Sequence, residues 1–376
     1  MHKNKLLIIS SESYGTHNGS AVIINRLLTN IDAENIIYMG IKPIKKGMLD
    51  APFKTYYLPY ISIHWRLEII YRLLSFIPAT LLGLFLLIKY KPKSILVFYP
   101  FENALFTAYL LRLISGTPIY PYLNDLYLEN RTGLMKQVAA FLQPRLFKKS
   151  EKIIVVNKGM NTFYQNKLNI NTEVIFTSIN EHIPTRVTVP EITGKFVLGY
   201  SGNINNDRID VFKTMVAALG NREDVEIRLF TGTTQKELEM QGAWSDNMSI
   251  RFIKKADELV HELGLCHALY LPLTFSTTGT PVDQLATCLG IKSYEYLICG
   301  APVIVQCPLE YYTSQFYIDR NCGMVIGENT TEALLKGITE LKNNKSLRQE
   351  LVNNSLIAAT EFTGQKNAEK LLNIIA

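Results

Sequence analysis

The sequence predicts an α/β protein of two Rossmann-like, doubly wound domains that face a cleft. Short apolar runs rich in β-branched residues alternate with helical stretches along the first half of the chain, and the alternation returns in the second half. Unbroken apolar strands that alternate with helices are typical of a parallel sheet covered on both faces. The length of 376 residues is too great for one ordinary core and fits two domains.

The strands are expected where apolar runs are bounded by turn residues. In the first half these runs are 5–10, 35–40, 94–99, 118–124, 152–157 and 173–177. In the second half they are 196–201, 225–231, 248–253, 268–272, 302–306 and 323–327.

The boundary between the two domains is expected near 183–195. This stretch, IPTRVTVPEITGK, has two prolines, a glycine and no helical period. The resulting division is an N-terminal domain over 1–190, a C-terminal domain over 191–355 and a last helix over 356–376. Packing of this helix on the N-terminal domain is one alternative.

The charge of the chain is unevenly distributed. The first 190 residues carry 22 Lys and Arg against 11 Asp and Glu, whereas acids outnumber bases in the rest of the chain. A basic half beside an acidic half suggests that only the first faces a polyanion. Within 131–170, eight basic residues accompany a single acid, Glu151.

A segment without charge, 73–88, lies between Arg72 and Lys89. A helix that spans a bilayer needs about 20 apolar residues, and this segment is shorter and contains Pro78 and Gly83. The expected structure is therefore a buried or surface-lying helix.

The segment 196–210, FVLGYSGNINNDRID, is the first candidate for a ligand site. Doubly wound sheets bind ligands where their strands end, near helix N-termini. Here a strand is expected to end at Gly202, and Arg208 begins the next helix. Glycine allows close backbone approach and arginine pairs with phosphate. A plain turn with a solvated arginine explains these residues equally well.

The segment 285–304, LATCLGIKSYEYLICGAPVI, is the second candidate. Gly290 opens a helix on which Lys292 and Glu295 share one face. A lysine in the first turn suits a diphosphate, and a glutamate one turn later suits the two hydroxyls of a ribose. A Lys–Glu pair on the surface is the alternative.

The run from Gly290 through Glu295 to 300–304 (GAPVI) resembles the signature of the retaining family 4 glycosyltransferases, which have the GT-B fold. The resemblance implies that Glu295 holds the donor ribose. The family's diphosphate-binding loop matches Gly202, Asn203 and Arg208, with Asn203 in the place of an arginine. Lys292 is expected to substitute for that missing phosphate contact.

A second departure concerns the transferred sugar. The family often has a glutamate eight residues before the ribose glutamate, and this chain has Thr287 there. Asp283 lies nearby and is the candidate to replace it. The donor-binding set is therefore Gly19, Gly202, Asn203, Asp283, Thr287, Gly290 and Glu295.

The N-terminal half resembles the family in two loops. In the loop 15–20, GTHNGS, Gly19 would approach the donor phosphates and His17 would contact the sugar or the acceptor. The family's His–Asp pair after the fifth strand corresponds to Asn124 and Asp125, so Asp125 is a catalytic candidate with Arg208 and Lys292. Glu102 is a further acceptor candidate, and an Asx turn or helix cap is the alternative for Asp125.

The resemblance implies transfer of a sugar, with retention, from a UDP- or GDP-sugar to a glycan or lipid-linked acceptor in bacterial surface polysaccharide synthesis. The chain has no D-x-D motif, so neither a metal nor another cofactor is expected. A nucleotide-sugar 2-epimerase of the same fold and a non-catalytic subunit are the alternatives.

The partners expected beyond these substrates follow from charge and motifs. The chain has neither a P-loop motif nor a recognisable nucleic-acid-binding module. The basic N-terminal half, with Lys89, Lys91 and Lys93 after the uncharged segment, suggests an anionic membrane surface. We expect a cytoplasmic protein that is peripheral at the inner face of the cell membrane.

Overall fold

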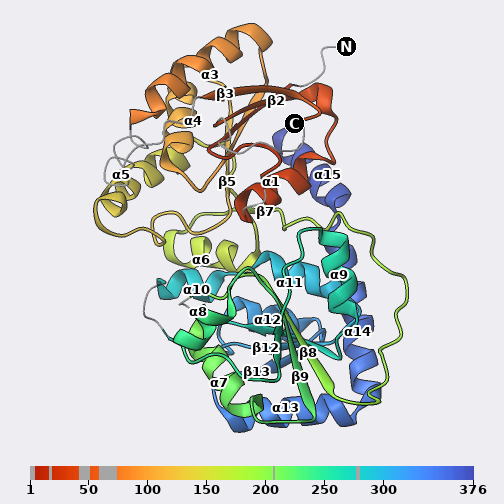
Figure 1. The fold of residues 1–376 in the computed structure, drawn as a ribbon. Coiled ribbons are helices and arrows are strands. Elements are labelled where there is room, and N and C mark those ends of the chain that lie inside the picture. Colours follow the sequence, from red (N-terminus) through yellow and green to blue (C-terminus); the bar gives the residue numbers. More distant parts are fainter. Residues whose placement is uncertain (1–4, 17–18, 42–50, 59–73, 206–207, 277–279) are drawn as a thin grey trace. The chain divides into compact units, whose positions relative to one another are not determined.

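The computed structural model describes residues 5–16, 19–41, 51–58, 74–205, 208–276 and 280–376. The chain divides into two compact units (Figure 1). Unit 1 combines Met1–Ser178 with Gly364–Ala376, and unit 2 is Ile179–Thr363.

Unit 1 is built on a parallel sheet, which has seven strands among the described residues, in the order β3-β2-β1-β4-β5-β6-β7. The chain begins in the middle of the sheet at β1, which pairs with β2 on one side and β4 on the other. The strands are β1 Leu6–Ser10, β2 Ile36–Ile41, β3 Lys54–Leu58, β4 Ser94–Phe98, β5 Ile119–Leu123, β6 Ile154–Val155 and β7 Glu173–Val174.

The helices of unit 1 form two groups. Helix α3 packs on α4 and α4 packs on α5, whereas α1 packs on α15 (Figure 1). Right-handed crossovers place α3, α4 and α5 on the face opposite α1, because β1 leads toward β2 while β4 leads toward β5. The helices are α1 Gly19–Leu28, α3 Phe76–Tyr90, α4 Glu102–Ser115, α5 Gly133–Lys149, α6 Lys158–Leu168 and α15 Gly364–Ile375, with a 3₁₀ turn at Ala33–Asn35.

Unit 2 repeats the scheme with a six-stranded parallel sheet in the described residues, ordered β10-β9-β8-β11-β12-β13. Its strands are β8 Phe196–Ser201, β9 Val225–Phe230, β10 Met248–Ile250, β11 Ala268–Pro272, β12 Val303–Gln306 and β13 Met324–Ile326. Its helices are α7 Ile209–Leu219, α8 Gln235–Met240, α9 Ala256–Gly264, α10 Val282–Thr287, α11 Ile291–Glu295, α12 Tyr312–Asp319, α13 Thr331–Asn343 and α14 Lys345–Ala359, with 3₁₀ turns at Tyr296–Ile298 and Thr360–Phe362.

The core of unit 2 forms where β8 meets α7. Phe196, Leu198 and Tyr200 alternate along β8 and are buried with Phe212 of α7. The rings of Tyr200 and Phe212 meet edge to face, with centroids 4.9 Å apart. This packing fixes the direction of the strand that leads to Gly202.

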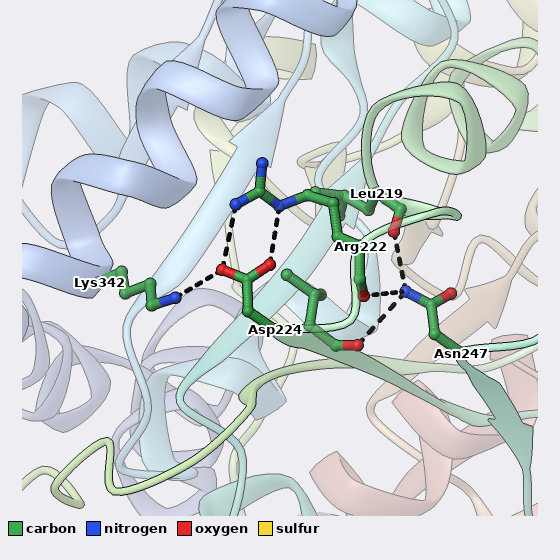
Figure 2. A network of polar contacts seen from close by, with 6 residues as sticks. Leu219, Arg222, Asp224, Asn247 and Lys342 are labelled. Carbon is green, nitrogen blue, oxygen red and sulfur yellow. Dashed lines mark hydrogen bonds and ion pairs between the residues drawn. The ribbon is translucent and has the colours of Figure 1, made fainter.

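The opposite end of unit 2 is held by a polar network around Asp224 (Figure 2). Arg222 and Lys342 bind the Asp224 carboxylate, and the side-chain amide of Asn247 donates to the carbonyl oxygen of Leu219 at 2.8 Å. The network joins the end of α7, the start of β9, the turn before β10 and α13. It lies at the amino ends of the strands, away from Gly202.

The prediction of two Rossmann-like, doubly wound domains is confirmed, and a strand lies within or overlaps each of the twelve expected segments. Strand β3, KTYYL, was missed. It is an edge strand of partly exposed residues and lacks the unbroken apolar run that marks the buried strands.

The division between the units falls at Ser178, whereas the sequence places it near 190. The segment after Ser178 packs within unit 2, where Val189 is buried against Val352. The side chain of Gln349 also donates to the carbonyl oxygen of Val187 and accepts from the N–H of Val189. The segment therefore belongs to unit 2 instead of forming an open linker.

The last helix, α15, belongs to unit 1. The amide of Asn367 donates to the carbonyl oxygen of Phe176 and to Oγ of Ser178, both at 3.0 Å. Helix α15 begins at Gly364, whereas the sequence places the start of this element at 356.

In the part of the chain that the structure describes, no helix is long and apolar enough to cross a membrane.

Candidate functional site

The order of the strands points to one place in unit 2 where a ligand can bind. The chain leaves β8 toward β9 on one side, while β11 lies on the other side of β8. In open parallel sheets, ligands bind where the strand order reverses in this way, at the carboxyl ends of the strands. In unit 2 this point is the loop that follows Ser201.

Tyr200 joins this loop to α11. Its hydroxyl donates to the carbonyl oxygen of Asn203 at 3.0 Å and accepts from Nζ of Lys292 at 2.7 Å. The ammonium of Lys292 also lies 4.2 Å from the centre of the Tyr200 ring. The lysine is thus held on a buried tyrosine beside the candidate phosphate loop.

Two features of position 202 favour glycine. Its φ of +91° lies in the left-handed region that favours glycine. A Cβ at this position would also lie 2.5 Å from Cε and 2.7 Å from Nζ of Lys292. The end of the Lys292 side chain therefore occupies the space that a side chain at residue 202 would fill.

Tyr296, which follows Glu295, fixes the end of β8. Its hydroxyl accepts hydrogen bonds from the N–H of Ser201 at 2.8 Å and from Oγ of Ser201 at 3.2 Å. Helix α11 spans only five residues and continues as a 3₁₀ turn from Tyr296. The helix expected around Lys292 and Glu295 is therefore short, and Tyr296 ties it to the loop.

The charges of Arg208, Lys292 and Glu295 act on one another. Burial and the nearby Arg208 guanidinium hold the pKa of Lys292 well below its ordinary value, and the Glu295 carboxylate opposes this shift. Burial raises the pKa of Tyr200, against the effect of Arg208. Two cations drawn together beside one carboxylate form a site that an added anion would stabilise.

A cavity of about 430 Å³ lies next to this cluster. It is bounded by the loop after β8 and the loop after β9, which are joined by a hydrogen bond from the N–H of Ile204 to Oγ1 of Thr233. Among the described residues its lining is Asn203, Ile204, Asn205, Gly232, Thr233, Glu237 and Gln241. The cavity shares Asn203 with the cluster, but Arg208, Lys292 and Glu295 are not part of its lining.

The candidates on α10 are placed differently. Thr287 is buried, and its hydroxyl donates to the carbonyl oxygen of Asp283 at 2.8 Å. The hydroxyl proton of Thr287 is therefore used inside the helix. Asp283 lies in the first turn of α10.

Gly290 is the N-cap residue of α11. A Cβ at this position would meet no atom within 4 Å, so the space beside Gly290 is open.

In unit 1, Asn124 and Asp125 follow β5 as expected. The amide of Asn124 donates to the carbonyl oxygen of Tyr99 at 3.1 Å. Its own Oδ1 is buried and has no hydrogen-bond partner among the described residues. Asp125 is half-buried, and its charge acts on Tyr99, whose pKa is raised mainly by burial.

Glu102 is buried in an ion pair. Its Oε1 lies 2.5 Å from Nε of Arg131, and the Arg131 guanidinium also donates to the carbonyl oxygen of Pro100. The guanidinium lies 5.0 Å from the centre of the Tyr99 ring. Glu102 is thus buried in this pair, and Arg131 is its more accessible partner.

The hydroxyls of Tyr99 and Tyr127 lie near this pair, and both are buried without a hydrogen-bond partner in the described chain. Their rings pack edge to face with centroids 5.1 Å apart. Both tyrosines are fully buried, so Arg131 is the most accessible polar group of this cluster. Sequence reasoning missed Tyr99, Tyr127 and Arg131, although Tyr99 stands at the end of an expected strand.

Two candidates belong to the loop after β1. Gly19 is the first residue of α1. His17 lies outside the described residues.

Within the described ranges, no group of three or more His, Cys, Asp and Glu side chains could hold a metal ion.

Several solved structures of other proteins resemble this chain over nearly its whole length. Sucrose-phosphate synthase from Thermosynechococcus elongatus superimposes with a TM-score of 0.74 at 13% sequence identity, over 98% of both chains. HepE from Anabaena, in complex with UDP, superimposes with a TM-score of 0.68 at 12% identity, also over 98% of both chains. The chain has the GT-B fold. No protein-family model matches it, and neither does any curated protein sequence.

The GT-B fold also occurs in a more distant match. A putative UDP-N-acetylglucosamine 2-epimerase from Listeria monocytogenes superimposes with a TM-score of 0.59 at 12% identity, over 99% of this chain and 96% of the other. In this GT-B chain, the Tyr200–Lys292 cluster lies in the C-terminal Rossmann-like unit. The Tyr99–Arg131 group lies in the N-terminal one.

Proposed function

We propose that this chain is a glycosyltransferase that moves a sugar from a UDP- or GDP-sugar to a glycan or lipid-linked acceptor, in bacterial surface polysaccharide synthesis. The observation that carries the proposal is the convergence of Arg208, Lys292 and Glu295 beside Gly202. Cationic side chains at the switch point of a parallel sheet suit a diphosphate, and a neighbouring carboxylate suits ribose hydroxyls.

The nucleotide is best supported as UDP. HepE superimposes on this chain in structures that contain UDP, UDP and glucose, and UDP-glucose. A nucleoside diphosphate carries about the charge that Arg208 and Lys292 together balance. The cavity beside Asn203 provides room for further parts of the donor.

In the proposed reaction the bond between the anomeric carbon and the donor phosphate oxygen breaks, and a bond from that carbon to the acceptor oxygen forms. Arg208 and Lys292 stabilise the negative charge that develops on the leaving diphosphate. The acceptor hydroxyl approaches on the face that the diphosphate leaves, and its proton passes to a phosphate oxygen. This path retains the anomeric configuration without a protein nucleophile.

The second route to retention uses a carboxylate nucleophile, for which Asp125 and Asp283 are the candidates. The acceptor would be held by unit 1, where Arg131, the more accessible partner of the pair with Glu102, offers a cationic group. Neither route requires a metal, because the cationic side chains take the role that a divalent ion would have.

A nucleotide-sugar 2-epimerase is the second candidate function, favoured by the Listeria monocytogenes match. An epimerase converts the donor without an acceptor, so incubation with UDP- and GDP-sugars alone separates the two. Formation of a 2-epimer in that incubation would exclude the transferase. A non-catalytic subunit should neither bind nucleotide tightly nor turn it over.

The direct test of the proposal is nucleotide binding by the Glu295→Gln variant. Two charge-assisted hydrogen bonds to ribose would be weakened, so the binding free energy of UDP should become less favourable by about 1.5–3 kcal/mol. Isothermal titration calorimetry measures the dissociation constant, and Glu340→Gln, an exposed glutamate on α13, is the matched control. Unchanged affinity in Glu295→Gln would remove the ribose contact from the proposal.

A further inference from the structure

Helix α3 exposes a continuous row of large apolar side chains. The residues are three or four positions apart, so they share one face of the helix. On α3, Ile77 is 50%, Leu81 65%, Phe85 49% and Ile88 76% exposed, and Leu74, just before the helix, is 56% exposed. We refer to these five side chains as the α3 stripe.

The other side of α3 is packed into unit 1. Gly83 faces α4, where a Cβ would lie 2.6 Å from Cδ1 of Leu111, and Phe76 stacks on Phe106. On α4, Leu113 and Ile114 follow Leu111 and are 50% and 61% exposed. The stripe is therefore the outer face of a well-packed helix pair, and the helix expected over 73–88 is not wholly buried.

A basic and aromatic cluster stands at the C-terminal end of the stripe. Lys5, Lys54 and Lys89 each place Nζ between 5.2 and 5.3 Å from the centre of the Tyr90 ring. Tyr56 forms a hydrogen bond with the Tyr90 hydroxyl. Lys91 and Lys93 continue the cluster and are exposed. Aromatic rings and long basic side chains of this kind favour the boundary between acyl chains and headgroups.

The surroundings of the stripe decide what can cover it. The sequence has no Asp or Glu between Glu68 and Glu102, which includes all of α3 and its basic end. A second copy that paired through the same stripe would supply apolar cover but no anions for the lysines. An anionic phospholipid surface supplies both, because acyl chains lie directly beneath its phosphates.

We propose that unit 1 docks on an anionic phospholipid bilayer through α3, with the stripe in the headgroup–acyl boundary and Lys89, Lys91 and Lys93 against lipid phosphates. Helix α3 has 15 residues, about 22 Å of helix, and lies along the bilayer surface. The inference goes beyond glycosyl transfer and does not depend on it, since docking is measured without donor or acceptor. A surface-docked enzyme would meet a lipid-linked acceptor where that acceptor resides.

The test is co-sedimentation of the full chain with vesicles of phosphatidylcholine, alone or with phosphatidylglycerol. We expect binding that requires phosphatidylglycerol and falls about tenfold or more as salt rises to about 0.5 M. The stripe variant Leu81→Gln/Ile88→Gln and the charge variant Lys89→Gln/Lys93→Gln should each bind about tenfold or more weakly.

Matched controls replace residues of the same kind in unit 2. Ile357→Gln removes a side chain on α14 that is 68% exposed, and Lys236→Gln/Lys336→Gln removes two exposed lysines. Both should bind vesicles like the wild type, and thermal unfolding confirms that every variant is folded. Absence of binding to anionic vesicles at low salt would overturn the proposal. So would a wild-type dimer that Leu81→Gln/Ile88→Gln converts to monomer without a change in vesicle binding.

Discussion

The residue whose environment is most informative is Lys292. It lies on the ring of Tyr200, donates to the Tyr200 hydroxyl and occupies the space that the missing side chain of Gly202 leaves. Burial and a second cation both disfavour its charged form. Such a lysine is costly for the fold, and an anion between Lys292 and Arg208 would favour its charged form, which is consistent with the proposed diphosphate site.

Removal of either cation should slow the chemical step. Without Arg208 or Lys292 the leaving diphosphate loses a charge contact, so Arg208→Ala and Lys292→Ala should each lower kcat about a hundredfold. The measurement is release of nucleoside diphosphate from a nucleotide-sugar at saturating acceptor. Lys213→Ala, an exposed lysine on α7, is the control and should turn over normally. Normal turnover in both site variants would place the phosphate site elsewhere.

Binding of a nucleoside diphosphate should be coupled to proton uptake. The pKa of free-site Lys292 is held below its ordinary value of 10.5, and an adjacent diphosphate raises it again. Affinity should therefore fall as pH rises through the range between the pKa of Lys292 in the free site and its raised pKa in the complex. Calorimetry in buffers of different ionisation enthalpy measures the protons taken up.

The Lys292→Ala variant is the control for this coupling. Its binding should be weaker, and it should take up fewer protons than the wild type. Equal proton uptake in both proteins would mean that another group titrates.

At the scale of elements, the Asp224 network shows how the turn between α7 and β9 is held (Figure 2). Arg222 binds both carboxylate oxygens at 3.0 Å, and Nζ of Lys342 lies 2.6 Å from one of them. These hydrogen bonds lower the pKa of Asp224 from 3.8 to about 2. Because α7 also carries Arg208 at its other end, the network helps to fix the helix that supports the site.

Asp224→Asn should lower the free energy of unfolding in a pH-dependent way. A lowered carboxyl pKa stabilises the fold above the unfolded value, and the contribution disappears as pH falls from about 4 to about 2. The side chain is 41% exposed, so solvent screening limits the effect to about 1 kcal/mol or less.

Urea unfolding at about pH 6 and about pH 3 measures this difference. The gap between wild type and variant should narrow at the lower pH, with Asp246→Asn as an exposed control. A gap that stays constant would show that the carboxylate charge is not what stabilises the turn.

At the scale of the whole molecule, the two units share an architecture but differ in their polar surfaces. Unit 2 brings Arg208, Lys292 and Glu295 together, whereas unit 1 carries the Arg131–Glu102 pair and the α3 stripe. This division fits a donor held by the second unit and an acceptor delivered to the first, with the membrane as the proposed source of the acceptor.

Glycosyl transfer should survive removal of divalent metal. Arg208 and Lys292 supply positive charge at the leaving group, so activity in excess EDTA should stay within about twofold of the untreated enzyme. The measurement is product formation with and without EDTA, followed by addition of Mg²⁺ or Mn²⁺. Loss of activity that either ion restores would contradict this expectation and require a metal on the diphosphate.

The sequence by itself determined the features that depend on neighbouring residues. Apolar runs and turn residues are local features of the sequence. They located the buried strands of both sheets because a strand that is buried on both faces consists of consecutive apolar residues. Gly202, Arg208 and Lys292 were predicted as site residues for the same reason, since each stands where an expected strand ends or an expected helix begins, and Glu295 was predicted one turn further along the same helix as Lys292. The uncharged segment before Lys89 likewise identified α3 as a helix without showing which side would be exposed.

The tertiary structure alone decided which side chains meet. Lys292 and Tyr200 are 92 positions apart, and nothing local to either residue indicates the other. Arg131 pairs with Glu102, which lies 29 positions earlier in the chain. The hydroxyl of Thr287 donates to a carbonyl oxygen of its own helix. Helix α15 joins unit 1 through contacts with residues some 190 positions earlier. These outcomes depend on how distant segments pack, because a side chain takes its partner from whatever the fold places beside it.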